Sequence, residues 1–229
     1  GEEERIDLLK FYLESARKSV KESFEEGIVS DGTAQGGRQM IGFGGAIPIV
    51  ANTGIYGGIN RADVAAWRTS EFNATTDFAA LGNVWDATTA RPMISQMTLN
   101  RSRGSQYPDL WIFDSNSWQA VEASFVAHQR LATERSARLG YSGMAYHTAA
   151  GLVDLVAAGG IGNVMPANTA FGIDTNNLSI YEFPGQSFVP FHPAGGLRPI
   201  NQDAMAQGIV WSGQMVVENP LSMIRLVTA

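Results

Sequence analysis

The chain contains no cysteine, and this absence removes several kinds of chemistry at once. Disulfide frameworks, thiolate metal sites and cysteine nucleophiles are all excluded. Lysine is also scarce, because only three of the 16 basic residues are lysines and all three precede residue 22. No basic cluster or tail follows, so the sequence does not favour sequence-specific nucleic-acid binding. The remaining cations are arginines, whose planar guanidinium group is favoured at protein interfaces.

Long apolar runs are missing as well. No run reaches the roughly 18 to 20 residues of a transmembrane helix, and the acidic residues 1–5 lack the basic-then-apolar order of a signal peptide. We therefore expect no membrane partner. Because the chain has no initiator methionine, we expect it to be processed, trimmed or excised from something longer. Its 229 residues, 45% of them hydrophobic, suffice for a substantial core in one large or two small domains.

The clearest predicted element is a helix over residues 2–27. Its apolar residues recur every three or four positions and predict one buried face: Ile6, Leu9, Leu13, Ala16, Val20 and Phe24. Three glutamates at its start suit the helix dipole, and Gly27 suits its end. Residues 28–75 contain nine glycines and predict a long ordered loop with brief strands.

The rest of the chain predicts two more helices and a series of strands. The helices are expected over 76–100, kinked or split at Pro92, and over 116–130, capped by Asp114 or Ser115. Strands are expected over 108–113, 144–146, 151–156, 178–183, 209–217 and 223–227. The last two strands are predicted to form a terminal hairpin that turns near 218–220. This order indicates an α+β fold and not a βαβ repeat.

Motif searches predict no catalytic, cofactor-binding or metal-binding residue. The glycine run at 159–164 has Met165 where a dinucleotide fingerprint needs glycine, and no lysine follows Lys21 to complete a phosphate loop. "GYSG" at 140–143 lacks the second glycine of a serine elbow. The three histidines are far apart and form no metal-binding pair. Asp154 lies inside an apolar run, where it is hydrogen-bonded in a core, exposed at a strand end or used at an interface.

Several short blocks follow one another along the chain. After the long helix come "SDGT" (30–33), "QMIGF" (39–43) and "TGIYGGINRADVAAWR" (53–68). They are followed by "PDLWIFDSNSWQAVEASFVAHQR" (108–130), "NTAFGIDTNNLSIYEFPG" (168–185) and "GIVWSGQMVVENPLSMIRL" (208–226). In this order the blocks resemble the major capsid proteins of tailed bacteriophages, which have the Hong Kong 97-like fold. No single block is diagnostic, and the likeness lies in their order.

The resemblance implies an organisation in three parts. Residues 1–74 would supply a spine helix and the glycine-rich loops of a peripheral domain, 75–170 an axial domain, and 171–229 strands that return mainly to the peripheral domain. In this family an N-terminal arm and an extended loop precede the spine helix. Because the spine-like helix starts here at residue 2, we expect either that the arm and loop were removed or that the chain lacks them. A Lys–Asn cross-link therefore has no support, since that loop would bear the lysine.

The function implied by the resemblance is that of a non-enzymatic structural subunit. Such a subunit self-assembles into hexamers and pentamers around the DNA genome, with scaffolding, portal or decoration proteins as further partners. It is made in the host bacterial cytoplasm and resides in the virion capsid. The net charge of −6 suits a shell that must enclose DNA without clinging to it.

Five residues are predicted to lie at subunit interfaces: Trp67, Arg68, Arg101, Arg103 and Asp154. Trp67 and Arg68 end the glycine-rich stretch 54–68 and are expected to anchor it against a neighbouring element or subunit. The alternative hypothesis is a small hydrolase or sugar-active enzyme. Its atypical site would lie in glycine-rich loops near Asp154 and either His147 or His192.

Overall fold

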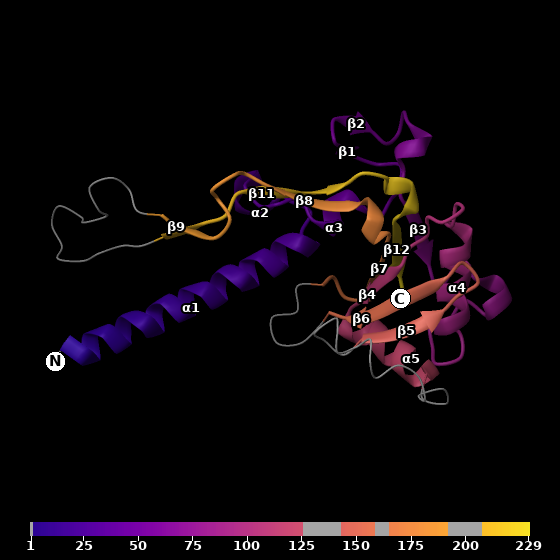
Figure 1. The fold of residues 1–229 in the computed structure, drawn as a ribbon. Coiled ribbons are helices and arrows are strands. Elements are labelled where there is room, and N and C mark those ends of the chain that lie inside the picture. The colour runs from indigo at the N-terminus through magenta and orange to yellow at the C-terminus, as the bar shows by residue number, and fades with distance from the viewer. Residues whose placement is uncertain (1, 126–142, 159–164, 192–207) are drawn as a thin grey trace.

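A six-stranded mixed sheet forms the centre of the protein (Figure 1). The computed structural model describes residues 2–125, 143–158, 165–191 and 208–229. Across the sheet the strands are β3 (Ser70–Asn73), β12 (Ile224–Val227), β7 (Thr169–Ile173), β4 (Leu110–Phe113), β6 (Leu152–Ala157) and β5 (Gly143–His147). The β3–β12 and β4–β6 pairs are parallel, and the other pairs are antiparallel. Mixed helices and strands make this an α+β protein.

The side chains of β4 point alternately to the two faces of the sheet, and the core therefore has two layers, one on each face. Trp111 and Phe113 point to one face of the sheet, where they pack against α4 (Ala90–Asn100) and α5 (Ser115–Phe125). Leu110 and Ile112 point to the opposite face. Successive side chains of a strand leave opposite sides of a sheet, so a strand with apolar residues at every position can serve two cores.

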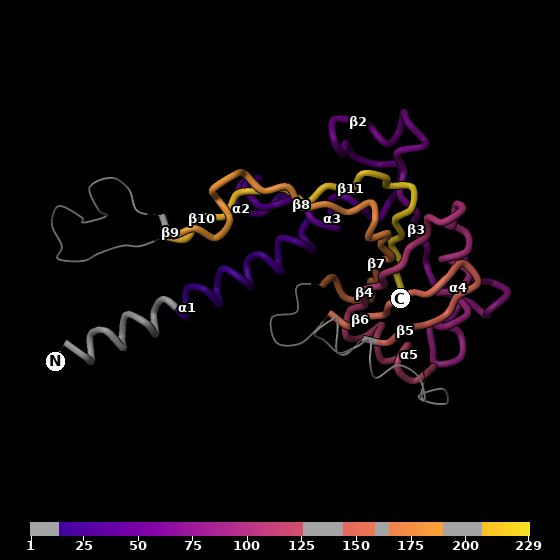
Figure 2. The backbone as a smooth tube through the Cα atoms, viewed as in Figure 1, coloured from indigo at the N-terminus to yellow at the C-terminus, as the bar shows by residue number. Residues whose placement is uncertain are grey.

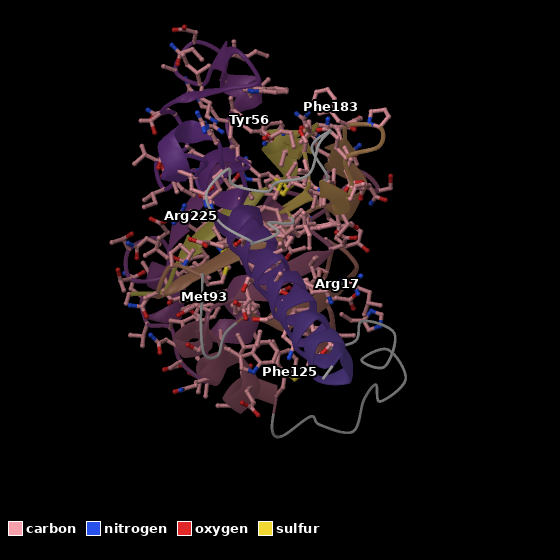
Figure 3. The ribbon with its side chains drawn as sticks, turned by 90° about the vertical axis from the view of Figure 1, so that its left-hand side faces the viewer. Arg17, Tyr56, Met93, Phe125, Phe183 and Arg225 are labelled. Atoms are coloured by element: carbon pink, nitrogen blue, oxygen red, sulfur yellow. The ribbon has the colours of Figure 1, made fainter. Side chains whose placement is uncertain are left out.

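The second layer is built from segments distant in sequence. It contains α3 (Phe43–Ala46), β1 (Ile55–Tyr56) and β11 (Gly213–Val217), together with the apolar residues of β7 that face away from α4. Figure 3 shows this division: Met93 and Phe125 lie in the lower part of the molecule, Tyr56 in the upper part, and Arg225 between them.

The predicted long helix is confirmed as α1 (Glu2–Val29), which projects away from the sheet (Figure 1). Among the residues of its apolar stripe from position 14 onward, Phe24 and Val20 are half-buried, whereas Ala16 is exposed. Beside α1 runs a two-stranded ribbon in which β8 (Leu178–Glu182) pairs with β11, and β9 (Val189–Phe191) with β10 (Gly208–Val210) (Figure 2). The Phe24 ring meets Phe188 and Trp211 of this ribbon at centroid distances of 5.6 and 4.9 Å.

Gly42 allows the start of α3 to cross the end of α1 at very close range. A Cβ atom at position 42 would lie 2.2 Å from the carbonyl oxygen of Ile28, which is a backbone clash. The Gly42 amide donates instead to the Ser30 carbonyl at 2.9 Å. Glycine is used here because backbone must approach backbone, and "QMIGF" therefore marks the junction of α1 with the second core layer.

The predicted helix over 76–100 is wrong in its first half. Residues 79–81 form only a single 3-10 turn, η2 (Ala79–Leu81), and Gly82 and Asn83 then adopt positive φ values of 84° and 53°. A right-handed helix cannot continue through such residues. Pro92 is the third residue of α4, where the missing amide hydrogen costs nothing because first-turn amides have no helical partner. The proline therefore belongs to the start of this helix and produces no kink.

The predicted terminal hairpin is also wrong. β11 pairs with β8 in the ribbon, whereas β12 pairs with β3 and β7 in the central sheet. Between them the 3-10 turn η5 (Pro220–Ser222) redirects the chain from the ribbon to the sheet. Two apolar strands joined by a short turn need not pair with each other, because pairing with strands distant in sequence can bury more of their apolar side chains.

The strand predicted over 209–217 is divided at residues 211–212 into β10 and β11, and the other predicted elements agree with the structure where it describes them. Asp114 caps α5 by accepting from the Ser117 amide at 3.1 Å, and the part of that predicted helix beyond 125 lies outside the described residues. The glycine-rich segment contains, as expected, only short elements. Those not yet named are α2 (Ala34–Gly37), β2 (Ile59–Asn60) and the 3-10 turn η1 (Ala65–Trp67), and another 3-10 turn, η4 (Thr175–Asn177), precedes β8. Within the described ranges, no helix combines the length and the apolar character needed to cross a bilayer.

Candidate functional site

A buried arginine holds the glycine-rich stretch 53–68 to the body of the protein. Arg61 is 2% exposed and donates to the carbonyls of Thr53, Gly45 and Ala46 at 3.2, 3.0 and 2.8 Å. Its guanidinium also lies over the Tyr56 ring, 5.3 Å from the centroid. Gly45 and Ala46 end α3, where carbonyls lack helical partners. Burial lowers the pKa of Arg61, yet its five donors make it suited to join several carbonyls at once.

Trp67 and Arg68 close the same stretch from its other end. The Trp67 indole donates to the Tyr56 carbonyl at 2.9 Å. Arg68 donates to the carbonyls of Arg61 and Ala62 at 2.7 and 2.6 Å. Both side chains are half-buried and are used within the protein to fix the loop. These bonds lie within the stretch 53–68 itself, and anchoring of the stretch against a neighbouring element or subunit stays a prediction.

A second buried arginine, missed by the sequence reasoning, reaches the same backbone. Arg225 of β12 is 6% exposed, donates to the Ile47 carbonyl at 3.2 Å and lies over the Phe171 ring at 5.2 Å. The guanidinium groups of Arg61 and Arg225, which are far apart in the sequence, thus bind neighbouring carbonyls of residues 45–47. The available signal was a single charge inside the apolar strand "MIRLV".

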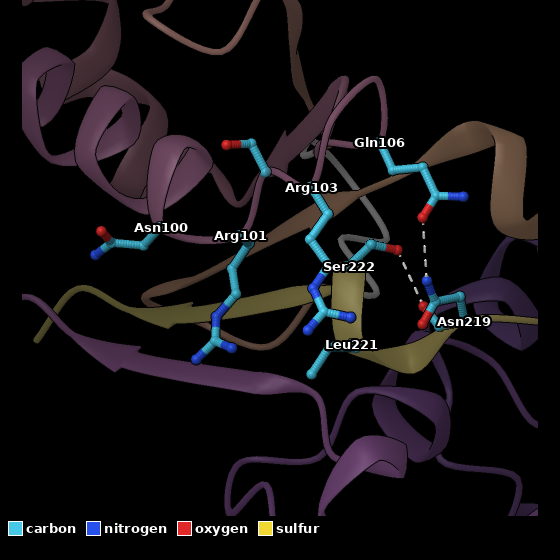
Figure 4. A pocket seen from close by; sticks show the side chains of 8 residues that line it. Asn100, Arg101, Arg103, Gln106, Asn219, Leu221 and Ser222 are labelled. Atoms are coloured by element: carbon cyan, nitrogen blue, oxygen red, sulfur yellow. Dashed lines mark hydrogen bonds between the residues drawn. The ribbon is translucent and has the colours of Figure 1, made fainter.

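The predicted interface residues Arg101 and Arg103 line one pocket, which follows α4. In Figure 4 both side chains extend into it from the segment that follows α4. Its complete lining is Asn100, Arg101, Ser102, Arg103, Gln106, Asn219, Leu221 and Ser222. The structure therefore brings together two of the five predicted interface residues, and adds a set of amides and hydroxyls that the sequence did not indicate.

Asp154 and His147 lie on neighbouring strands without forming a recognisable catalytic site. Asp154 of β6 is half-buried and stands opposite Ala145 of β5, whereas His147 is exposed and stands opposite Leu152. Neither residue lines the arginine pocket, the cavity beside α1 or the hollow over α4. His192 lies outside the described residues. The geometry therefore gives the hydrolase alternative no support.

The ribbon beside α1 carries a group of large apolar side chains that face solvent. Their exposed fractions range from 40% for Phe188 to 66% for Phe183, which lies at the outer edge of the molecule in Figure 3. The other members are Ile180, Tyr181 and Val189. A cluster of this kind on one element is typical of a surface that contacts another protein.

No group of three or more histidine, aspartate or glutamate side chains suited to a metal ion occurs among the described residues.

Comparison with known proteins supplies a structural relative and no sequence relative. No family model matches the chain, and no curated protein matches it. Among solved structures, a chain of the cyanophage A-1(L) capsid asymmetric unit is similar, with a TM-score of 0.65 and 16% sequence identity. The match covers 97% of this chain and 69% of that chain. The protein therefore shares its fold with a phage capsid chain along almost its whole length.

Proposed function

We propose that this chain is a structural subunit of an icosahedral bacteriophage capsid, a major capsid protein with the Hong Kong 97-like fold. The observation that carries the proposal is the fold shared with a cyanophage capsid chain over 97% of this sequence. The projecting α1 would be the spine helix. Copies would assemble into hexamers and pentamers around the DNA genome, after synthesis in the host cytoplasm. No reaction is assigned to the protein.

The division of the chain follows from the same proposal. Residues 1–74 and 171–229 would supply mainly the peripheral domain, and 75–170 the axial domain. The two core layers support two lobes, although strands from all three ranges contribute to the central sheet. Scaffolding, portal or decoration proteins would be further partners.

The proposed subunit contacts comprise the five residues predicted from the sequence and the apolar ribbon. Arg101 and Arg103 line an open pocket, and Trp67 and Arg68 fix the shape of a loop that exposes Ile55 at 72%. A contact surface needs apolar area together with oriented polar groups. Obligate interfaces of roughly 2,000 Å² or more would cover both the five predicted residues and the apolar ribbon.

Electron microscopy and sedimentation of the purified protein test this function. We expect rings, sheets or closed shells whose abundance rises steeply with protein concentration. A protein that stays monomeric up to high concentration would contradict the proposal. Hydrolytic activity that is lost on Asp154→Asn substitution would support the enzyme alternative instead.

A further inference from the structure

The pocket beside α4 is lined almost entirely by groups that donate hydrogen bonds. Two guanidinium groups, from Arg101 and Arg103, share it with amide and hydroxyl side chains, and Leu221 is its one apolar member. No carboxylate is among its eight lining residues, and its volume is about 280 Å³. A cavity with this lining is complementary to an anion and not to a cation or an apolar group.

Arg101 is half-buried, and one of its nitrogen atoms has lost contact with water, as have the corresponding atoms of Arg61 and Arg225. The Nε atom of Arg101 is shielded from solvent and makes no hydrogen bond in the described structure. Burial also lowers the pKa of Arg101. Unsatisfied buried donors are uncommon in folded proteins, because the lost hydration is not replaced. Within the part of the chain that the structure describes, Arg101 also makes no internal hydrogen bond through its terminal nitrogens comparable to those of Arg61 and Arg225, so its guanidinium group is available to an acceptor in the pocket.

The pocket walls are held in place before any ligand arrives. The backbones of Arg103 and Gln106 exchange hydrogen bonds of 2.7 and 3.0 Å across a turn that begins two residues after Arg101. The Gln106 side chain accepts from the Asn219 amide at 3.5 Å, a contact drawn in Figure 4. Because Asn219 precedes η5, this contact ties the turn after α4 to a distant part of the chain. Such preorganisation reduces the entropy lost on binding.

We infer that the Arg101–Arg103 pocket binds a carboxylate side chain of a second copy of this chain. The inference rests on the proposed function and deepens it by naming the chemistry of one contact. A carboxylate matches a guanidinium fork with two parallel hydrogen bonds.

The charge balance of the chain favours a second copy as the source of the carboxylate. The sequence has 22 acidic and 16 basic residues, and Arg61 and Arg225 are committed to internal carbonyls. Each copy therefore presents acids in excess of free cations. Phosphate of a nucleic acid is disfavoured, since a backbone-binding surface needs a series of cations and the other lining residues here are neutral.

A cross-linking experiment with an Arg101→Lys variant tests the inference directly. A carbodiimide joins an amine to a carboxylate only when the two are in contact. Assemblies of mixed ¹⁴N and ¹⁵N protein distinguish bonds between copies from bonds within one copy. We expect residue 101 to be joined to one dominant Asp or Glu of the other copy. Arg38→Lys, at an exposed position outside the pocket, is the control and should give scattered products.

The double variant Arg101→Met/Arg103→Met supplies the second measurement. We expect an unchanged melting temperature, and assembly that needs at least a tenfold higher protein concentration, whereas Arg38→Met assembles like the wild type. Equal assembly of the double variant and the wild type, or a cross-link only within one copy, would overturn this inference alone. Normal assembly with reduced co-purified nucleic acid would overturn it in favour of a phosphate ligand. A monomeric wild type would overturn the proposed function, and this inference with it.

Discussion

Replacing Arg61 by methionine should destabilise the protein strongly, because the side chain joins three carbonyl groups from two segments. Three bonds from a charged donor contribute about 1.5 kcal/mol each to stability, at the low end of the range for such bonds. Methionine fills much of the volume of the arginine side chain and carries no charge that must be desolvated. These two effects offset about 1–1.5 kcal/mol of the lost stability. Thr53 and Gly45 accept at the edge of solvent and can recruit water, whereas Ala46 accepts in the interior. The expected loss is therefore about 3 kcal/mol.

Urea unfolding followed by tryptophan fluorescence measures this loss, and thermal unfolding checks it. For a chain of this size about 3 kcal/mol corresponds to a melting temperature lower by about 6–12 °C. Arg61→Lys should also be destabilised, because a single ammonium group cannot reach three carbonyls in the geometry of a guanidinium. The matched control is Arg38→Met at an exposed position. If Arg61→Met melted with the control, the clamp would contribute nothing and the reasoning would be refuted.

Three further predictions concern other contacts. Gly172→Ala should cost about 1–3 kcal/mol in denaturant unfolding, since the new methyl group would lie 2.9 Å from the fully buried Trp111 ring; an unchanged midpoint would show that the ring can move. Asp86→Ala should lower the melting temperature at neutral pH, because bonds from Thr88 hold the pKa of Asp86 below its ordinary value of 3.8. The carboxylate's contribution is complete above 3.8 and disappears as the pH falls through the lower folded-state value, so the two proteins should converge in acid. Trp67→Ala should cost about 2 kcal/mol by removing a half-buried indole and its hydrogen bond, and wild-type melting and assembly would refute the anchoring role.

Local patterns predicted those elements whose formation depends on neighbouring residues. The long helix followed from its apolar spacing, β4 from the run "LWIF", and the cap of α5 from Asp114. In each case the signal and its physical cause lie within one or two turns of chain. The α+β class followed from the order of these elements.

Long-range pairing could not be predicted in the same way. The strand pattern of β12 is identical whether it pairs with β11 in a hairpin or inserts between β3 and β7. Burial against distant partners decides between these pairings. Arg225 illustrates the same limit, because its carbonyl partner is 178 residues away in sequence.

The candidate pocket shows which part of a site a sequence can indicate. Arg101 and Arg103 were chosen for their residue type, which is favoured at interfaces. Their shared orientation, the participation of Asn219 and the unsatisfied Nε atom of Arg101 depend on tertiary structure. The interface roles of Trp67, Arg68 and Asp154 stay predictions.

The position of β12 in the central sheet determines when the protein can finish folding during its synthesis. β3 joins the sheet through β12, although residues 70–73 leave the ribosome about 150 residues earlier. Until residues 224–227 emerge, β3 lacks this partner, and the core near α4 lacks Ile224 and Leu226. Long-range parallel pairing is slow and leaves apolar surface exposed meanwhile. A translation product that stops before residue 224 therefore cannot complete this sheet, so β3 and the core near α4 reach their final packing only after a segment about 150 residues later has been made.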